Sequence, residues 1–487
     1  MKRIFVFAFA VFCALALLGA CSGGGGGGGD NPGTSGDAES AVATPQGDPY
    51  DPGITPKDFG GYEFRILAND HASLTWAMTT MVVEEETGEP ILDSIYLRNK
   101  FIEDKYNIAI REIKGNFGTV YATARKSIVS GSDDFDLMIE DNRHLAALMQ
   151  EGKLQDLTGY PHLDFGRPWW DKDSVDDLSI GKKRFIVAGD MTLAHYDCTC
   201  AVIFNKRLIQ DNGLADPYAL VRENKWTLDN FELLMKSVSQ DLDGDGKFTK
   251  EDLYGFTSLS FVSVPAFLYG ADARPVAMDG DGFPELAAGS EKFAAIYERL
   301  TEMFHADNHT YDTIIKRTDH RLPEYMFKEG KALFWSQLIY WTSQLRDMAD
   351  DFGILPFPKQ NAEQGRYHSM VFGAPVICIP ATNADGDRTG MVMEAMCAES
   401  RRNIIPAYYD KTMVNKISRD DDTVEMLDII FGSRLYQIES IYLPFVIDGI
   451  VAQYEKGNTG IAAFIESISG KAEKERQAII EAFETNG

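Results

Sequence analysis

The sequence lacks a basic excess. Its 487 residues contain 74 Asp and Glu against 47 Lys and Arg, which gives a formal net charge of −27 at pH 7. A protein that binds nucleic acid needs a basic surface to neutralise phosphate, and a protein held on anionic lipid by charge needs a polybasic cluster. The composition therefore argues against a nucleic-acid partner and against an electrostatic hold on a membrane.

Long apolar runs and familiar catalytic motifs are also lacking. Beyond the first twenty residues, no stretch reaches the ~18 consecutive apolar residues that span a bilayer. We find no Gly-x-Ser-x-Gly elbow, zinc signature, phosphate loop or fixed-period repeat. Hydrophobic residues nevertheless make up 44% and aromatic residues 11% of the chain, enough for large cores. A chain of this length predicts two to four domains or lobes.

The first residues have the pattern of an export signal. Lys2 and Arg3 precede an apolar run over 4–18, followed by Leu-Gly-Ala and Cys21. Small residues directly before a cysteine resemble the lipobox of bacterial lipoproteins, which implies that residues 1–20 are removed and Cys21 is lipidated. The alternative is an ordinary signal peptide with an incidental cysteine. The lipobox predicts a protein on the outer face of the cytoplasmic membrane, attached only through its lipid.

A glycine-rich segment follows. Residues 23–29 are seven consecutive glycines, and the chain to residue 57 is rich in Gly, Pro, Ser, Thr and Asp. Such a segment buries too little apolar surface to offset the entropy of ordering it. We expect residues 21–57 to be a flexible tether.

Cysteine is scarce in the remaining body. Four thiols are left there, Cys198, Cys200, Cys378 and Cys397. Their spacing fits neither a zinc ribbon nor a thioredoxin motif. A bridge from Cys198 or Cys200 to Cys378 is one interpretation, and we favour the other, four buried thiols.

The body alternates between strand and helix patterns. Period-2 or short apolar segments predict strands, and apolar residues at helical spacing predict helices. The expected strands are 62–68, 107–113, 135–139, 201–204, 332–335, 352–355 and 375–379. The expected helices are 91–106, 117–129, 143–150, 226–240 and 290–304, and the last hundred residues are mostly helical. This order predicts an α/β protein with mainly parallel sheets and a ligand crevice at the carboxyl ends of the strands.

Several phrases of the sequence resemble bacterial extracellular solute-binding proteins of the family 1 type, which supply ABC importers, in particular carbohydrate importers. The phrases follow the family's order along the chain. They are Phe-Asp-Leu-Met at 135–138, Gly-Lys-Leu-Gln-Asp-Leu at 152–157, Asn-Lys at 205–206, Trp-Thr-Leu-Asp at 226–229, 327–335 and 353–359.

The resemblance implies a two-lobed periplasmic-binding-protein-like fold of type II, with a hinge between the lobes. Lobe one is expected to contain residues 58–197 and 335–382, and lobe two residues 200–334 and 383–487. It also implies a monomer that captures a sugar or oligosaccharide and passes it to ABC permease subunits, with no enzymatic activity. Two alternatives stay open, a lipid-anchored glycan hydrolase and a binder of a non-carbohydrate solute on the same fold.

Candidate solute-binding residues are those expected at strand ends that face the crevice. Carbohydrate pockets combine aromatic rings with carboxylates, amides and arginine, and pockets in general are apolar with a few placed polar groups. For any single aromatic residue, core packing is the competing interpretation. The candidates are Asp141, Asn142, Arg143, Tyr196, Asp197, Trp335, Gln337 and Phe372.

One segment has the ligand spacing of a calcium loop. Calcium takes six to eight oxygen ligands, and a twelve-residue loop supplies them at positions 1, 3, 5, 7, 9 and 12 around a glycine at position 6. Residues 241–252 match this pattern with Gly246 at position 6. The expected ligands of a structural Ca²⁺ are Asp241, Asp243, Asp245, the Lys247 carbonyl, Thr249 and Asp252.

Two features depart from that pattern: Asp replaces the usual Glu at position 12, and no long helix is expected after the loop. An ordinary acidic turn is the alternative. The similar segment 279–282 lacks further ligands and lies between alternating segments, so we expect a β-hairpin turn there.

Overall fold

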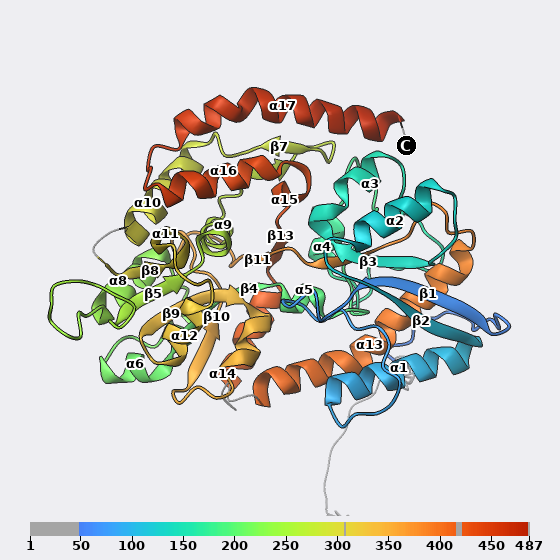
Figure 1. The fold of residues 1–487 in the computed structure, drawn as a ribbon, viewed down its shortest axis with the longest axis horizontal. Coiled ribbons are helices and arrows are strands. Elements are labelled where there is room, and N and C mark those ends of the chain that lie inside the picture. Colours follow the sequence, from blue (N-terminus) through green and yellow to red (C-terminus); the bar gives the residue numbers. More distant parts are fainter. Residues whose placement is uncertain (1–47, 306–307, 415–420, 486–487) are drawn as a thin grey trace, which may run out of the picture. The chain divides into compact units, whose positions relative to one another are not determined.

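Two large β-sheets organise the chain, and two further sheets have two strands each (Figure 1). The computed structural model describes residues 48–305, 308–414 and 421–485. The predicted signal peptide, Cys21 and the glycine run lie outside these residues. None of the described helices combines the length and apolar character needed to cross a bilayer.

The first sheet has four strands in the order β12-β3-β1-β2. β1 is parallel to both β2 and β3, whereas β12 is antiparallel to β3. The strands are β1 (Tyr62–Asn69), β2 (Ile108–Gly115), β3 (Leu137–Asp141) and β12 (Pro375–Cys378). β3 and β12 are buried along their whole length, in keeping with their short apolar sequences.

The second sheet has five strands in the order β10-β4-β9-β5-β8. β5 is parallel to β8 and β9, whereas β4 is antiparallel to β9 and β10. Two of the strand pairs in this sheet are therefore parallel and two are antiparallel, whereas the sequence predicted a mainly parallel sheet. The strands are β4 (Cys200–Asn205), β5 (Tyr254–Ser258), β8 (Thr310–Asp312), β9 (Ala332–Leu338) and β10 (Phe352–Leu355).

The two sheets share one arrangement. In each, three parallel strands follow the chain order 2-1-3, β2-β1-β3 in the first sheet and β8-β5-β9 in the second. A strand from a distant part of the chain then joins antiparallel, β12 beside β3 and β4 beside β9. Loops after the parallel strands gather at their carboxyl ends, where ligands bind in sheets of this kind.

Helices associated with the first sheet follow its strands. α1 begins at Pro90, with the Glu89 side chain accepting from Leu92 N at 2.9 Å, and it ends before Asn107, which has a φ of 48°. The helices are α1 (Pro90–Tyr106), α2 (Val120–Val129), η1 (Asn142–His144), α3 (Ala146–Gln150), α4 (Lys172–Asp177) and α5 (Ala194–Asp197).

Helices around the second sheet are more numerous. They are α6 (Lys206–Asp211), α7 (Pro217–Arg222), α8 (Leu228–Val238), α9 (Ser260–Gly270), α10 (Glu291–His305), α11 (Thr313–Lys316), α12 (Leu322–Lys328), η2 (Ile339–Leu345) and α14 (Asp421–Phe431). The predicted hairpin is present as antiparallel β6 (Val276–Met278) and β7 (Pro284–Leu286). The chain ends in α15 (Glu439–Tyr442), α16 (Pro444–Glu455) and α17 (Ala462–Thr485), as the helical prediction for the last hundred residues expects.

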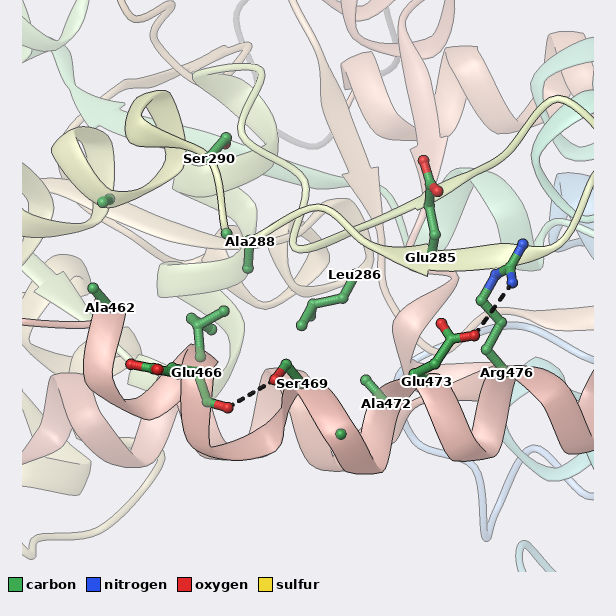
Figure 2. Close-up of a pocket in the computed structure, with 14 residues that line it drawn as sticks. Glu285, Leu286, Ala288, Ser290, Ala462, Glu466, Ser469, Ala472, Glu473 and Arg476 are labelled. Carbon is green, nitrogen blue, oxygen red and sulfur yellow. Dashed lines mark hydrogen bonds and ion pairs between the residues drawn. The ribbon is translucent and has the colours of Figure 1, made fainter.

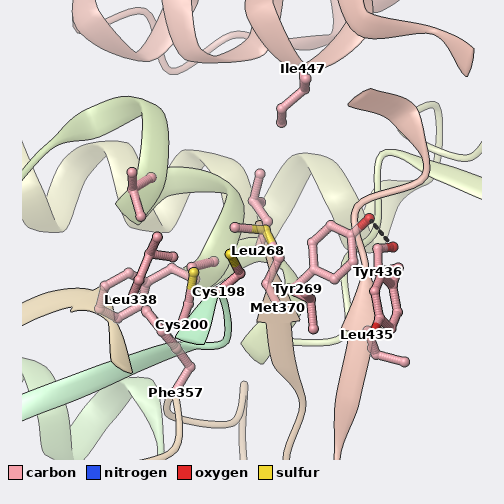
Figure 3. Close-up of a cluster of buried hydrophobic side chains, with 14 of the residues drawn as sticks. Cys198, Cys200, Leu268, Tyr269, Leu338, Phe357, Met370, Leu435, Tyr436 and Ile447 are labelled. Atoms are coloured by element: carbon pink, nitrogen blue, oxygen red, sulfur yellow. Dashed lines mark hydrogen bonds between the residues drawn. The ribbon is translucent and has the colours of Figure 1, made fainter. Parts of the chain in front are cut away.

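Three segments run between the two sheets and lie together. Thr199, which leads into β4, pairs with Val371 at the end of β11 (Ser369–Val371), and β11 pairs in parallel with β13 (Arg434–Tyr436). Figure 3 shows part of the apolar cluster around them, to which Cys198, Met370 and Leu435 belong. This adjacency is what a hinge between two lobes requires.

The strand pairing changes the predicted lobe boundaries. β9 pairs with β4 and β5, and β10 pairs with β4, so both strands belong to the second sheet. The prediction that residues 335–382 all belong to lobe one does not hold for these strands, because the chain returns to the first sheet only at β12. Apolar runs of this length do not encode which sheet a strand joins.

α13 (Gly386–Val414) also differs from the prediction, which placed residues from 383 onward in lobe two. Its first half packs against α1 and contributes Val392 and Met396 to the core of the first sheet. Its second half contributes Ile404 and Tyr408 to a core that includes Ile203 of β4. The helix therefore extends along both sheets.

Residues 50–57 are not part of a tether, contrary to the prediction for residues 21–57. From Tyr50 onward the chain belongs to the same compact unit as the sheets. Ile54 packs against the core of the first sheet, and Lys57 Nζ lies 2.8 Å from Asp387 Oδ2. The Pro- and Gly-rich composition did not show that these few apolar and charged side chains find partners on the body. The four body cysteines are free and buried, as favoured from the sequence.

Candidate functional site

A cavity of about 430 Å³ lies where loops from both sheets meet. The first sheet contributes Trp76, from the loop after β1, and Arg143, which follows β3. The second sheet contributes β9 and the segments that follow β5. The lining residues are Trp76, Arg143, Leu259, Phe261, Val262, His320, Arg321, Glu324, Trp335, Gln337, Leu338, Trp341 and Phe372. The position is the carboxyl-end crevice that the strand order predicts.

Arg143 is held in place by Asp141. Arg143 Nε donates to Asp141 Oδ1 at 2.8 Å and Nη2 donates to Oδ2 at 2.5 Å, and the Asp141 side chain is fully buried. Burial by itself lowers the pKa of Arg143, but the hydrogen bonds and the charge of Asp141 outweigh it, so the pKa is raised. Such a bidentate pair fixes the plane of the guanidinium as well as its charge.

Two aromatic rings continue in a row from the Arg143 guanidinium. The Arg143 guanidinium lies 5.2 Å from the Phe372 ring centre, and Phe372 lies 6.4 Å from Phe261. Gly373 makes this packing possible, because its φ is 55° and a Cβ there would lie 2.8 Å from Arg143 Cζ. We call Arg143, Phe372 and Phe261 the ridge.

β9 and α12 supply the opposite wall of the cavity. Trp335 is 2% exposed and its Nε1 has no hydrogen-bond partner among the described residues. Gln337 Oε1 accepts from Leu338 N at 2.9 Å, so the side-chain oxygen is engaged and the amide nitrogen is its other polar group. Arg321 Nη2 pairs with the buried Glu324 at 3.2 Å, so the guanidinium is the exposed member of this pair.

The structure brings some of the predicted site residues together and separates others. Arg143, Trp335, Gln337 and Phe372 line the cavity, and Asp141 supports it from behind. Asn142 is buried beside them with no partner for its Oδ1 among the described residues, but it does not line the cavity.

Tyr196 and Asp197 do not line this cavity. Tyr196 is a core residue whose hydroxyl donates to Asp190 Oδ1 at 2.9 Å, and burial raises the pKa of Asp190 to about 7. Asp197 accepts from Met78 N at 2.7 Å and from Tyr408 at 2.9 Å, and it lines a different cavity of about 500 Å³. Both residues lie just before the chain enters β4, as predicted, but α5 directs their side chains into the core and the other cavity instead of this one.

Nine other lining residues were not among the candidates: Trp76, Leu259, Phe261, Val262, His320, Arg321, Glu324, Leu338 and Trp341. Trp76 lies in the loop seven residues after the end of β1, and it is placed by an edge contact with Phe117 at 4.8 Å and by its Nε1, 3.4 Å from Gly373 O. Phe261 lies in the first turn of α9, three residues after the end of β5, so a strand assignment at 254–258 would have pointed to it. Nothing in the sequence marks the α12 residues.

A second cavity, of about 450 Å³, adjoins the first. The two share only the three ridge residues. Its other lining residues come from α15, α16 and the segment before them: Gln437, Ser440, Pro444, Ile447, Asp448, Val451, Ala452 and Glu455.

A larger cavity, of about 870 Å³, lies elsewhere, between α17 and the β7 region. Figure 2 shows Leu286, Ala288 and Ser290 opposite Ala472 and Ser469 of α17. Its lining is mostly small side chains, with no aromatic ring, and no parallel strand ends there. Size alone therefore does not make it the candidate site.

The predicted calcium loop folds as a closed turn. Gln240 and Leu253 pair at its two ends, and Gly246 has a φ of 82°, the left-handed conformation expected at position 6. Carboxylate oxygens of three residues lie within 4.8 Å of one another, those of Asp241, Asp243 and Asp252. These oxygens are of the type that Ca²⁺ prefers. β5 follows the loop, so the absence of a second helix is as expected.

No protein-family model and no curated protein matches the chain. Solved structures do match. An ABC substrate-binding protein from Listeria monocytogenes, in complex with cycloalternan, is 13% identical with a TM-score of 0.57, and the match covers 85% of this chain and 98% of that one. A cyclo/maltodextrin-binding protein complexed with maltotetraose is 12% identical with a TM-score of 0.57, over 87% of this chain and 96% of that one.

The GacH receptor of Streptomyces glaucescens, solved unliganded and with acarbose, is 13% identical with a TM-score of 0.54, over 86% of this chain and 99% of that one. At these identities the likeness concerns the fold. The chain has the two-lobed α/β fold of ABC solute-binding proteins, as the sequence predicts.

Proposed function

We propose that this chain is a solute-binding protein that captures a sugar or oligosaccharide between its two lobes and delivers it to an ABC importer. The observation that carries the proposal is the composition of the cavity between the sheets. Three tryptophans and two phenylalanines line it beside an oriented arginine and a glutamine amide. Aromatic faces pack on the C–H faces of sugars, and fixed donors bind their hydroxyls.

The same cavity argues against glycan hydrolysis. Glycosidases use two carboxylates that flank the scissile bond. Glu324 is the only carboxylate among the residues that line this cavity, and it is paired with Arg321. The adjoining cavity adds Asp448 and Glu455, but both belong to one helix, α16, rather than to two opposite walls. We therefore propose binding without turnover, in keeping with the similar structures, which are binding proteins and a receptor.

The test is a solute panel read by intrinsic tryptophan fluorescence and by thermal shift. Trp76, Trp335 and Trp341 line the cavity, so a bound sugar is expected to change the emission. Trp335→Phe should weaken the response, whereas Phe101→Ala, at a ring 46% exposed on α1, should not. A response to polyamines or peptides but to no saccharide would contradict the carbohydrate assignment, and release of cleaved glycan would contradict binding without turnover.

We also propose that the protein works on the outer face of the cytoplasmic membrane as a monomer, anchored through a lipid on Cys21. The support is the lipobox-like sequence before Cys21, together with a fold typical of proteins that bind extracytoplasmic solutes. Metabolic labelling with a radioactive fatty acid is expected to label the protein and to fail for Cys21→Ser.

A structural Ca²⁺ in the 241–252 loop completes the proposal. Asp241, Asp243 and Asp252 would supply carboxylate oxygens, with Asp245, Thr249 and the Lys247 carbonyl as the remaining ligands. The ion would offset the repulsion between these carboxylates and stabilise the loop before β5. It has no part in solute binding, because none of these residues lines the cavity.

A further inference from the structure

The ridge lies between two cavities of similar size. Arg143, Phe372 and Phe261 line both the cavity of about 430 Å³ and the one of about 450 Å³, and no other residue does. Phe261 is 38% exposed and the Arg143 side chain 28%. A large apolar ring left this open beside two cavities is a surface on which a ligand can lie.

Polar groups stand on both sides of the ridge. Gln337 and Arg321 line only the first cavity. Asp448 and Glu455 of α16 line only the second, where Asp448 is exposed and Glu455 Oε1 accepts from Ser260 Oγ at 2.9 Å. Donors therefore dominate one side and carboxylate acceptors the other, and both kinds of group bind hydroxyls.

Arg143 is oriented to serve both sides. Asp141 takes its Nε and Nη2, so the Nη1 hydrogens remain for a ligand. Because the Asp141 pair, the Phe372 ring and the Gly373 backbone all constrain the guanidinium, its donors have a fixed direction. A fixed donor at the junction of two cavities suits the oxygen atoms between two linked units of a solute.

We propose that the two cavities are compartments of one site and that the solute is an oligosaccharide that crosses the ridge. One unit packs among Trp335, Trp341 and Gln337, and another lies against α16. This inference rests on the proposed function, since it specifies the length of the saccharide that the cleft takes. Asp448 and Glu455 then contribute to the specificity for the sugar unit in the second cavity.

The experiment compares chain lengths on the purified full-length protein. Gluco-, malto- and xylo-oligosaccharides of one to four units are titrated calorimetrically. In the series that binds, affinity is expected to rise about tenfold or more between the single unit and the longer chains, which corresponds to ~1.4 kcal/mol.

Two variants separate the compartments. Ala452→Phe places a ring in the second cavity and is expected to weaken the longer chains about tenfold while changing the shortest bound saccharide little. Gln337→Ala, in the first cavity, should weaken every length. The melting temperature of Ala452→Phe shows whether this variant has a folding defect. Asp448→Ser also alters the second cavity, at an exposed position, and should likewise weaken the longer chains more than the shortest saccharide.

The outcomes distinguish this inference from the proposed function. If no saccharide of any length binds, both fail. If a single unit binds as tightly as its oligomers, or if Ala452→Phe and Asp448→Ser affect all lengths equally, the protein is still a sugar-binding protein but the two-compartment site is refuted.

Discussion

The fully buried carboxylate of Asp141 accepts two hydrogen bonds from the guanidinium of Arg143, at 2.8 Å and 2.5 Å. The two residues are only two positions apart in the sequence. Asp141 ends β3, and the 3-10 turn η1 that follows brings Arg143 back over it. The turn is capped by the same carboxylate, because Asp141 Oδ1 also accepts from Arg143 N at 3.0 Å. One side chain thus ends a strand, caps a turn and orients the proposed solute donor.

Replacing Arg143 is expected to lower both the free energy of unfolding and the affinity for the solute, and a second substitution should restore only the first. Arg143→Met leaves the Asp141 carboxylate buried without its charged partner, and breaking such a pair costs about 3 kcal/mol. Denaturant unfolding measures the loss. In the double variant Asp141→Asn/Arg143→Met the stability should largely return, while solute binding should stay lost. Binding that recovers with stability would show that Arg143 has only a structural role.

A methyl group at Gly373 should displace the same guanidinium. The Cβ of Gly373→Ala would lie 2.8 Å from Arg143 Cζ, and the residue keeps a left-handed φ of 55°, which costs an alanine about 1 kcal/mol. We expect weaker solute binding, measured by calorimetry, with a small drop in melting temperature. Gly159→Ala is the matched control, since Gly159 also has a left-handed φ, of 68°, and a Cβ there meets nothing within 4 Å. Unchanged affinity for Gly373→Ala would argue against a fixed Arg143.

Calcium is expected to stabilise the protein through the 241–252 loop. Extracellular calcium modules bind with dissociation constants of about 10⁻⁴–10⁻³ M, so millimolar Ca²⁺ added to metal-stripped protein should raise the melting temperature. Asp243→Asn should abolish this rise. Asp281→Asn, in the acidic turn of the β6–β7 hairpin, should leave it intact. A failure of metal-stripped protein to take up Ca²⁺ in calorimetry would refute the site.

Glu394 should make stability depend on pH. Its carboxylate accepts from Trp169 Nε1 at 3.0 Å and from Trp170 Nε1 at 2.8 Å, and burial raises its pKa to about 7. An unfolded glutamate has a pKa of about 4.3, so the folded protein holds this proton more tightly. The contribution to stability is fully present below about pH 4 and is lost as the pH rises through 7.

The measurement compares the wild type with Glu394→Gln, which lacks the titrating group. Relative to Glu394→Gln, the wild type should lose roughly 3 kcal/mol of unfolding free energy between pH 4 and pH 8. The control is Glu298→Gln on α10, at an exposed position. A pH dependence equal in the wild type and Glu394→Gln would contradict the expected titration.

Local pattern was enough for most elements. The segment 62–68 is β1, the segment 91–106 is all but the first residue of α1, and the acidic turn at 279–282 closes a hairpin as expected. These assignments depend on alternation, helical spacing and turn residues, which act between near neighbours in the chain. The same reasoning found Arg143 and Asp141, because they directly follow a well-marked strand.

The amino-acid sequence by itself determined the α/β class, the acidic surface, the export pattern at Cys21 and the spacing of the 241–252 loop. Tertiary structure decided which sheet receives β9 and β10, and which aromatic rings meet. Trp76 and Phe261 are 185 residues apart, yet they line one cavity. Tyr196 comes just before β4 in the sequence, yet it lies in the core rather than in the cavity. Such choices depend on packing between segments distant in sequence, and neither periodicity nor spacing encodes them.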